Sequence, residues 1–361
     1  MWYRRGWTAG YRLDMSACVR PAKPRPGDTV AVLSPASGLP ELVPAPYELG
    51  LRRLRDEFGL RVVEYPTSRK MGSSPQERAA DLHAAFGDPQ IAAVFASIGG
   101  DDQLTVLPHL DRDLLAANPK PFFGYSDNTN LLVTLRNLGI VSYHGGSVML
   151  ELGRPGALHP LTAASLRAAL FGSDEYELTE ATRFTEINSR WEDPRTFEAE
   201  PATEPATGWY WHQPDRVVDG PVWGGNLEIL SMLLMADREI EPPDSYAGSV
   251  LLLETSEEMP SGDTVYRILR SMGERGLLRQ FPALLMGRPK AWSFDQPLDA
   301  DGRVRYRAAQ REAVLRAFGE YAPDTMIVFD VDLGHTDPQL VIPVGGQARI
   351  DGPAHRITVT Y

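Results

Sequence analysis

Short apolar runs alternate with amphipathic, helix-like segments along this chain, and this alternation constrains the fold more than any other feature. In the first half the apolar runs lie at 29–33, 61–65, 91–98, 122–124 and 139–143, with helical periodicity at 45–58 and 75–87. Such runs suit strands that are buried on both faces of a parallel sheet. Strands and helices at this spacing predict an α/β protein whose sheet is covered by helices.

The same alternation returns in the second half, after a stretch that is rich in Pro, Glu and Thr. Apolar runs at 249–254, 283–287 and 326–330 predict strands, 264–276 and 305–318 predict helices, and 347–351 with 356–361 predicts a terminal hairpin. We therefore expect a first domain over 23–170, a linker and aromatic-rich loop over 171–219, and a second domain over 220–361.

Charge and cysteine content narrow the classes of function. The formal net charge of -12 argues against a nucleic-acid polymer or an anionic membrane as a general partner. Cys18 is the only cysteine, so an intrachain disulfide and a cysteine metal site are excluded. The chain has neither an apolar run of about 18 residues, as a transmembrane helix needs, nor the apolar core of a signal peptide. We expect a cytoplasmic protein with a disordered leader over residues 1–22.

The stretch 122–132, FFGYSDNTNLL, predicts a strand, a tight turn and a helix, with Ser126 at the bend. A serine in this position has an exposed hydroxyl, and the backbone N–H groups of the first helical turn point towards the group that it attacks. The stretch is also consistent with a serine that merely caps an ordinary helix. The choice between a nucleophile and a cap depends on the rest of the chain.

A nucleophilic serine needs a base, and the base needs a group that orients it. Of the 7 histidines, His335 is the best candidate, because it follows an apolar strand in a Gly-His-Thr loop from which an imidazole can protrude; His144 and His212 are weaker ones. Glu254 is the best orienting carboxylate, because a glutamate that ends an all-apolar strand needs a partner. A purely structural role for His335 stays open on these grounds.

Three tryptophans, Trp191, Trp209 and Trp211, mark the stretch between the two halves. A pure linker would not contain them. They predict either a segment that packs on the second domain or an aromatic lid over a site.

Several motifs in order give the chain a resemblance to a known family. It resembles the LD-carboxypeptidase family of serine peptidases, which includes murein tetrapeptide carboxypeptidases and microcin C immunity peptidases. The resemblance spans roughly residues 24–355 and rests on Pro26-Gly27-Asp28, Ser34-Pro35, Ser97-Ile98-Gly99-Gly100-Asp101-Asp102, Gly124-Tyr125-Ser126-Asp127-Asn128-Thr129, Gly224-Gly225-Asn226-Leu227, Leu253-Glu254, Gly287-Arg288 and Gly334-His335-Thr336. Two features depart from it, namely His144-Gly145-Gly146 in place of a more typical Tyr-Gly-Pro, and an insertion at 290–305.

The resemblance implies a fold and a set of site residues. The fold is a flavodoxin- or Rossmann-like N-terminal parallel-sheet domain followed by a smaller C-terminal α/β domain of the swivelling β/β/α kind. The triad is Ser126, Glu254 and His335, and the cleft lies between the domains. The N–H groups of Asp127 and Gly100 form the oxyanion hole, and the expected substrate contacts are Gly99, Asp101, Asn226, Trp191, Trp209 and Trp211. No metal or cofactor is required, and a homodimer is implied.

Two substrates fit the resemblance. The long segment at 186–219 is similar to the microcin C immunity branch, in which an aromatic loop stacks on the base of a peptidyl- or aminoacyl-nucleotide whose amide-like bond is cut. The alternative is a murein tetrapeptide that loses its terminal D-Ala. A non-catalytic small-molecule binding protein is a third reading. A nicotinamide enzyme is disfavoured, because 34–38 reads SPASG where a Gly-x-Gly-x-x-Gly would stand.

Overall fold

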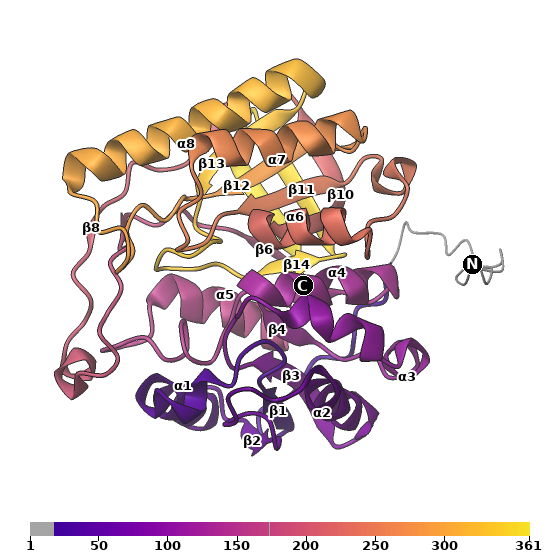
Figure 1. Cartoon of the computed structure of the whole chain (residues 1–361), viewed down its shortest axis with the longest axis vertical. Helices are drawn as coiled ribbons and strands as arrows, with labels where there is room; N and C mark the ends of the chain where they lie inside the picture. Colours follow the sequence, from indigo (N-terminus) through magenta and orange to yellow (C-terminus); the bar gives the residue numbers. More distant parts are fainter. Residues whose placement is uncertain (1–17, 173) are drawn as a thin grey trace.

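Residues 18–172 and 174–361 are described by a computed structural model, shown in Figure 1. In the N-terminal half the strands are β1 (Thr29–Leu33), β2 (Arg61–Glu64), β3 (Ile91–Ala96), β4 (Phe122–Gly124) and β5 (Ser142–His144), and the helices are α1 (Pro44–Asp56), α2 (Pro75–Gly87), α3 (Arg112–Ala117), α4 (Thr129–Asn137) and α5 (Pro160–Phe171). These strands pair in parallel. Successive residues of β1 alternate between two cores, one with α1 and α5 and the other with α2, α3 and α4. The predicted helix-covered parallel sheet is confirmed.

The C-terminal half repeats strand and helix but has a different second layer. Its elements are β10 (Val217–Asn226), α6 (Leu227–Ala236), β11 (Val250–Glu254), α7 (Gly262–Glu274), β12 (Ala283–Gly287), α8 (Ala300–Tyr321), β13 (Met326–Val331), β14 (Ile342–Val344), β15 (Gln347–Asp351) and β16 (Arg356–Thr360). Leu251 and Leu253 face the helices α6, α7 and α8, whereas Leu252 belongs to the core that holds Ile350 and Val359 of the terminal hairpin. The half is therefore layered β/β/α, as expected.

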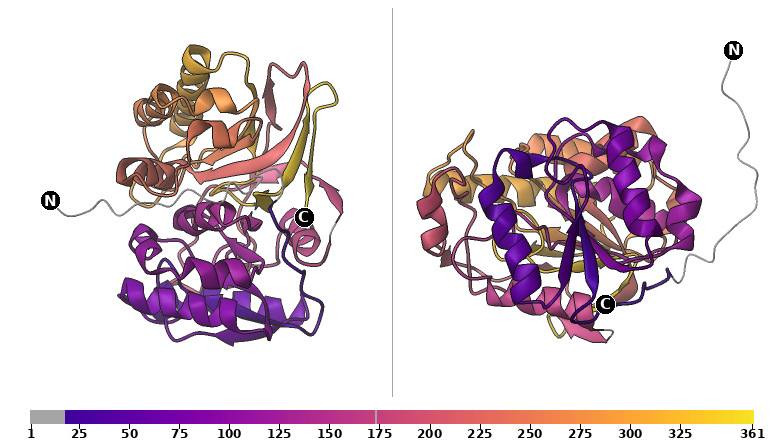
Figure 2. Two further views of the ribbon diagram at one scale, coloured as in Figure 1. Left: turned by 90° about the vertical axis from the view of Figure 1, so that its right-hand side faces the viewer. Right: turned by 90° about the horizontal axis from the view of Figure 1, so that it is seen from below.

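One sheet runs through both halves. The described strands follow the order β2-β1-β3-β4-β5-β14-β10-β11-β12-β13, because β14 lies antiparallel to β5 and parallel to β10. Figure 2 shows the halves stacked, with β10 and the terminal hairpin along one side. The sheet crosses the expected domain boundary, so the division at 23–170, 171–219 and 220–361 stays a prediction. The crossing brings the strand ends of both halves to one region.

Two element boundaries differ from the sequence prediction for local reasons. The strand expected at 139–143 starts at Ser142, because Gly139 takes a φ of 75° in the turn after α4. The helix expected at 305–318 starts at Ala300, where the Asp299 side chain accepts a hydrogen bond from the N–H of Gly302 at 2.7 Å. The expected insertion at 290–305 therefore contains the first turn and a half of α8.

The segment between the halves contains the short strands β6 (Glu175–Glu177), β7 (Arg183–Phe184), β8 (Glu204–Pro205) and β9 (Tyr210–His212). Between β7 and β8 the chain leaves the upper half in Figure 1 and reaches a 3₁₀ turn, Pro194–Glu198, near α1 of the lower half. Glu200 pairs there with Arg154 at 2.9 Å. We call residues 186–203 the bridging loop, because it spans the side of both halves.

The start of the described chain is held against the N-terminal half. The N–H of Val19 donates to the carbonyl of Gly139 at 2.7 Å, and the N–H of Val141 donates to Val19 at 3.0 Å. Residues 18–22 therefore differ from the expected disordered leader, whose remainder, residues 1–17, lies outside the described residues. Among the residues that the structure describes, no helix is long and apolar enough to cross a membrane.

Candidate active site

Ser126 lies at a sharp turn between β4 and α4. Its backbone is left-handed, with a φ of 61°, and a 3₁₀ turn over Ser126–Asn128 leads into α4. A non-glycine residue in this conformation marks a strained turn of the kind found at functional sites. Asn128, not Ser126, occupies the capping position of α4, so the alternative of a helix-capping serine does not fit. Gly99 leaves room for the side chain of Ser126, because a Cβ on Gly99 would lie only 2.8 Å from the Cβ of Ser126.

Glu254 ends β11 with its side chain fully buried. The Nδ2 of Asn226 donates to its Oε1 at 3.0 Å. Gly287 and Gly334 make room for it, because a Cβ on these residues would lie 2.7 Å and 3.1 Å from the Cβ of Glu254. Burial acts to raise the pKa of this carboxyl, but the positive charge and hydrogen bond of His335 hold it below its usual value.

His335 follows β13 and points its ring at this carboxylate. Its Nδ1 lies 2.5 Å from Oε2 of Glu254, and its side chain is 7% exposed. The ring of Tyr125 packs edge-on against it with centroids 4.9 Å apart. Burial lowers the pKa of His335, but the charge and hydrogen bond of Glu254 outweigh this and raise it to about 9. The buried carboxylate of Glu254 therefore holds the imidazole in position and stabilises its charged form.

The second ring nitrogen of His335 faces a carboxylate that the sequence analysis did not single out. Oε2 of Glu257 lies 3.3 Å from Nε2 of His335, and the Glu257 side chain is 52% exposed. The signal for Glu257 was present, since it follows Glu254 by only three positions at the same sheet edge. What the sequence could not show is that the loop turns this side chain back onto the imidazole.

A single cavity of about 590 Å³ gathers most of the expected site residues. Ser126 and His335 line it together, from opposite halves of the chain. Gly99, Gly100, Asp101 and Trp191 also line it. Its remaining walls include Glu151, Glu257, Lys290 and Phe294. The expected juxtaposition of residues from the two halves is thus present in the geometry.

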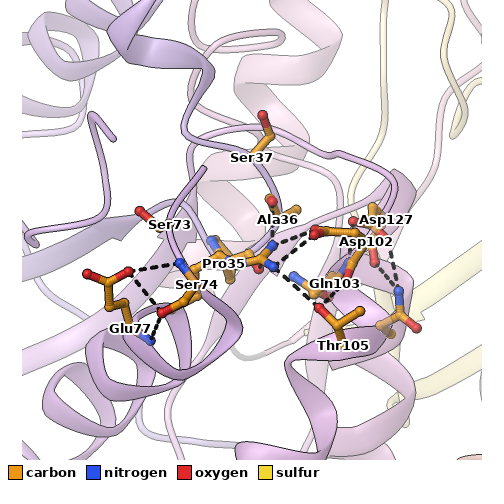
Figure 3. Close-up of polar contacts among 12 residues, drawn as sticks. Pro35, Ala36, Ser37, Ser73, Ser74, Glu77, Asp102, Gln103, Thr105 and Asp127 are labelled. Atoms are coloured by element: carbon orange, nitrogen blue, oxygen red, sulfur yellow. Dashed lines mark hydrogen bonds and ion pairs between the residues drawn. The ribbon is translucent and has the colours of Figure 1, made fainter. Parts of the chain in front are cut away.

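A buried arginine fixes the loop that carries Gly100. Arg78 is 4% exposed, and its guanidinium donates to the Ala36 carbonyl at 2.7 Å and to Asp102 at 2.6 Å. The guanidinium also donates to Oγ1 of Thr105 at 3.4 Å, and Figure 3 shows Ala36, Asp102 and Thr105 close to one another. Asp127 holds the loop from the other side, because its Oδ2 accepts the N–H of Gln103 at 2.9 Å. Burial raises the pKa of Asp127 to about 6.

Three of the expected substrate contacts do not line the cavity. Trp209 is 8% exposed, and its indole N–H donates to Asp332 at 3.0 Å. Trp211 stacks on His355 with centroids 5.0 Å apart. Asn226 is buried, because it reaches Glu254 rather than the cavity. The sequence did not separate Trp191 from the other two, because all three give the same local signal and Trp191 itself packs against the core while it lines the cavity.

His144 supports the loop that carries His335. Its ring is fully buried, and its Nε2 donates to the carbonyl of Leu333 at 2.9 Å. Burial lowers its pKa. His144 is therefore placed as a structural tie between β5 and this loop. In the part of the chain that the structure describes, no group of three or more His, Cys, Asp or Glu is arranged to hold a metal ion.

Comparison with family models gives matches in both halves. Residues 30–145 match the LD-carboxypeptidase N-terminal domain, and residues 219–350 match the LD-carboxypeptidase C-terminal domain. Among relatives, the probable murein peptide carboxypeptidase of Bacillus subtilis is 28% identical over 340 residues, covering 90% of this chain and 89% of the relative. The microcin C7 self-immunity protein MccF of Escherichia coli is 25% identical over 288 residues, covering 79% and 78%.

Solved structures show the same fold. An MccF-like protein from Streptococcus pneumoniae in complex with AMP matches with a TM-score of 0.81 and 25% identity, over 93% of this chain and 99% of its own. The microcin C7 self-immunity protein MccF in complex with aspartyl sulfamoyl adenosine matches with a TM-score of 0.81 and 22% identity, over 94% and 98%. With both of its halves matched by the family models, this chain belongs to the LD-carboxypeptidase family.

Proposed function

We propose that this protein is a serine-type amide hydrolase with the triad Ser126, His335 and Glu254. The observation that carries the proposal is the combination of a strained serine and a histidine in one cavity, with the histidine 2.5 Å from a fully buried carboxylate. A buried carboxylate that contacts only structural partners would not need to present an imidazole to a cavity. The resemblance in chain order, Ser then Glu then His, supports the same assignment.

In the proposed reaction the Oγ of Ser126 adds to the amide carbonyl carbon while its proton passes to Nε2 of His335. Glu254 keeps Nδ1 protonated and stabilises the imidazolium that forms. The tetrahedral intermediate then expels the amine, which takes the proton from Nε2, and leaves an ester on Ser126. A water molecule then attacks the ester in the same way, with His335 again taking and returning the proton, and the acid is released. Glu257 must leave Nε2 first, which its half-exposed side chain permits.

The negative oxygen of the intermediate needs preorganised donors. We assign them to the backbone N–H groups of Asp127 and Gly100. Gly100 lies in the loop that Arg78 and Asp127 fix, and a Cβ at Gly100 would lie 3.2 Å from Ala36 and 3.2 Å from Oδ2 of Asp127. This close packing supports a rigid oxyanion hole, because the loop that carries Gly100 has no space to change its conformation.

For the substrate we favour a peptidyl- or aminoacyl-nucleotide. The cavity of about 590 Å³ is of the size that holds a drug-sized ligand. Trp191 supplies an aromatic face on which a base can stack. Solved relatives bound to AMP or to aspartyl sulfamoyl adenosine share the fold. A murein tetrapeptide ending in D-Ala is the second candidate, supported by the Bacillus subtilis relative described as a probable murein peptide carboxypeptidase. We further expect the protein to be a homodimer, as the family resemblance implies, and to be located in the cytoplasm.

The test is a mass-spectrometric cleavage assay with aminoacyl-sulfamoyl-adenosine and a murein tetrapeptide as separate substrates. Ser126→Ala is expected to lower kcat at least about 10⁴-fold on whichever substrate is cut. Ser73→Ala, which changes a partly exposed serine on the loop before α2, is the control and is expected to cut like the parent. Full activity in Ser126→Ala would refute the triad. Cleavage of the tetrapeptide alone would establish the second candidate, and binding without cleavage of either would revive a non-catalytic role.

A further inference from the structure

Lys290 is a buried lysine in the wall of the cavity, and the proposed reaction does not use it. Lys290 is 6% exposed, and its Nζ donates to the backbone carbonyl of His335 at 3.1 Å. It follows the end of β12 by three positions, at the sheet edge where Glu254 and His335 also lie. Within the described chain it has no ion-pair partner.

Arg154 also lines the cavity, but its guanidinium is already paired with two carboxylates. Arg154 donates through Nε to Asp337 at 2.8 Å and pairs through Nη1 with Glu200 at 2.9 Å. The same Nη1 also donates to the carbonyl of Ala157 at 2.6 Å. Its guanidinium therefore holds the bridging loop in place. In the described chain two carboxylates match the charge of Arg154, whereas Lys290 contacts none and uses one of its three donors on the His335 carbonyl.

The carboxylates nearest to Lys290 each have another partner. Glu186 pairs with Arg303 at 2.8 Å and with Arg307 at 2.5 Å, Asp337 pairs with Arg154, and Glu257 contacts His335. A buried ammonium without a direct counter-ion is costly. Burial lowers the pKa of Lys290, but only to about 8, so the amine remains mostly protonated at neutral pH. An anion from outside the chain would complete the site.

The bond from Lys290 to the His335 backbone indicates where that anion would sit. In an acyl-transfer reaction the histidine gives its proton to the leaving amine, so the leaving group lies beside the histidine. We propose that Lys290 binds a negative group on the leaving side of the scissile amide. The group is either the α-carboxylate of a C-terminal amino acid or the acidic phosphoramidate or sulfamate whose nitrogen joins an acyl group to a nucleoside. This inference rests on the proposed hydrolase function and names the charge that its substrate must carry.

The experiment compares charged and uncharged forms of each substrate at pH 7. The first pair is the tetrapeptide with a free terminal carboxylate and the same peptide with a terminal carboxamide. The second pair is aminoacyl-sulfamoyl-adenosine and an aminoacyl amide of 5′-amino-5′-deoxyadenosine, which has an uncharged linkage. The parent, Lys290→Met and Lys290→Arg are assayed for kcat/KM, and Kd for the four ligands is measured with each enzyme in a Ser126→Ala background. Lys120→Met is the matched control, since Lys120 is a buried lysine that bonds backbone carbonyls outside the cavity.

The parent is expected to prefer the charged member of one pair, which identifies the source of the anion. Lys290→Met should lower kcat/KM for that charged substrate about 100-fold and leave the uncharged one nearly unchanged, as expected for loss of a desolvated charge pair. Lys290→Arg should restore part of the preference, and Lys120→Met should keep it. Equal losses on charged and uncharged substrates would mean that Lys290 only supports the His335 loop, and would overturn the proposal. So would a preference that survives in Lys290→Met.

Failure of the hydrolase proposal gives a different pattern. If no ligand is cut, yet Kd still shows a preference for the charged form that depends on Lys290, the anion site stands without the chemistry. If hydrolysis proceeds and Kd shows no such dependence, the hydrolase stands and Lys290 has no part in recognition.

Discussion

Nε2 of His335 lies 3.3 Å from Glu257, while Nδ1 of the same ring lies 2.5 Å from Glu254. The imidazole is therefore held between two carboxylates, of which one is fully buried and the other is 52% exposed. Both favour the charged imidazolium, and together they help to raise the pKa of His335 to about 9. In the proposed reaction a protonated His335 cannot accept the serine proton, so the contact with Glu257 favours the inactive protonation state of the free enzyme.

Removing the charge of Glu257 is expected to move the pH profile. Because kcat/KM reports the free enzyme, its rising limb should follow deprotonation of His335. Glu257→Gln removes one of the charges that raise this pKa, so the limb should move to lower pH, by roughly 0.5–1 unit for a partly exposed carboxylate. Activity at pH 7 should rise accordingly. The measurement is kcat/KM from pH 5.5 to 10 on the cleaved substrate.

Glu258→Gln is the control for Glu257→Gln, because Glu258 is the adjacent exposed carboxylate and lines the same cavity without contacting His335. Its profile should match the parent. A profile that stays in place in Glu257→Gln would show that the contact with Nε2 is absent in solution.

The three residues of the proposed triad could be picked out of the sequence because the features that place them are local. Apolar runs identify the strands, polar residues that follow them identify the site, and parallel strands bring such residues to one edge. Ser126, Glu254 and His335 each follow or end such a run. The link between the halves was not predictable in the same way. β14 has only three residues, Ile342–Val344, and its role depends on two neighbours far away in the sequence.

Residues that depend on loop conformation were missed or misplaced. Lys290 and Glu257 lie in connections whose path is set by packing, so the sequence shows the charge but not the direction of the side chain. Trp209 and Trp211 were expected at the substrate and lie in or against the core instead, because Asp332 and His355 supply their partners. The alternation of apolar and polar residues contains no information on these contacts.

Asn226 is expected to act on catalysis through Glu254. Its Nδ2 donates to Glu254, and its Oδ1 accepts the N–H of Ile229 at 3.0 Å, which caps α6. Asn226→Ala removes both bonds. The free energy of unfolding should fall by about 2–4 kcal/mol, from a lost cap and a buried carboxylate that has lost a donor. At a temperature where the variant stays folded, kcat should fall about 10–100-fold.

Ser261→Ala separates these two effects of Asn226→Ala. Ser261 caps α7 by accepting the N–H of Thr264 at 3.2 Å and touches no residue of the triad. It should lose about 1 kcal/mol of stability with kcat unchanged. Denaturant unfolding and steady-state kinetics check both variants. Asn226→Ala with an unchanged kcat would show that Glu254 keeps its orientation without this bond.

Substitution of Trp191 and of Trp211 is expected to have different effects on KM. Trp191 lines the cavity and also packs partly buried against the core, so Trp191→Ala should raise KM for a nucleotide substrate by roughly 10-fold, as for the loss of one stacked base, with little change in kcat and some loss of stability. Trp211→Ala should leave KM unchanged and lower the free energy of unfolding by about 1–3 kcal/mol, because its ring is half-buried against the core and stacks on His355. Steady-state kinetics with thermal unfolding tests both, and equal effects on KM would contradict the placement.

The close approach of Gly99 to Ser126 gives the sharpest steric test. A Cβ on Gly99 would lie 2.8 Å from the Cβ of Ser126 and 3.0 Å from its Oγ, closer than carbon and oxygen atoms pack. Gly99→Ala should therefore displace the nucleophile and lower kcat by at least about 100-fold, since small misplacements of reacting groups have effects of this size.

Gly319→Ala provides the opposite control for Gly99→Ala. Gly319 lies within α8, and a Cβ there meets no atom within 4 Å. The variant should be more stable by about 0.5–1 kcal/mol, since alanine favours the helix, and fully active. Turnover assays and thermal unfolding on the three proteins separate the local steric effect from a general one. Parent-like turnover in Gly99→Ala would mean that the hydroxyl of Ser126 reacts from another position, and the strained turn would then not be the element that presents the nucleophile.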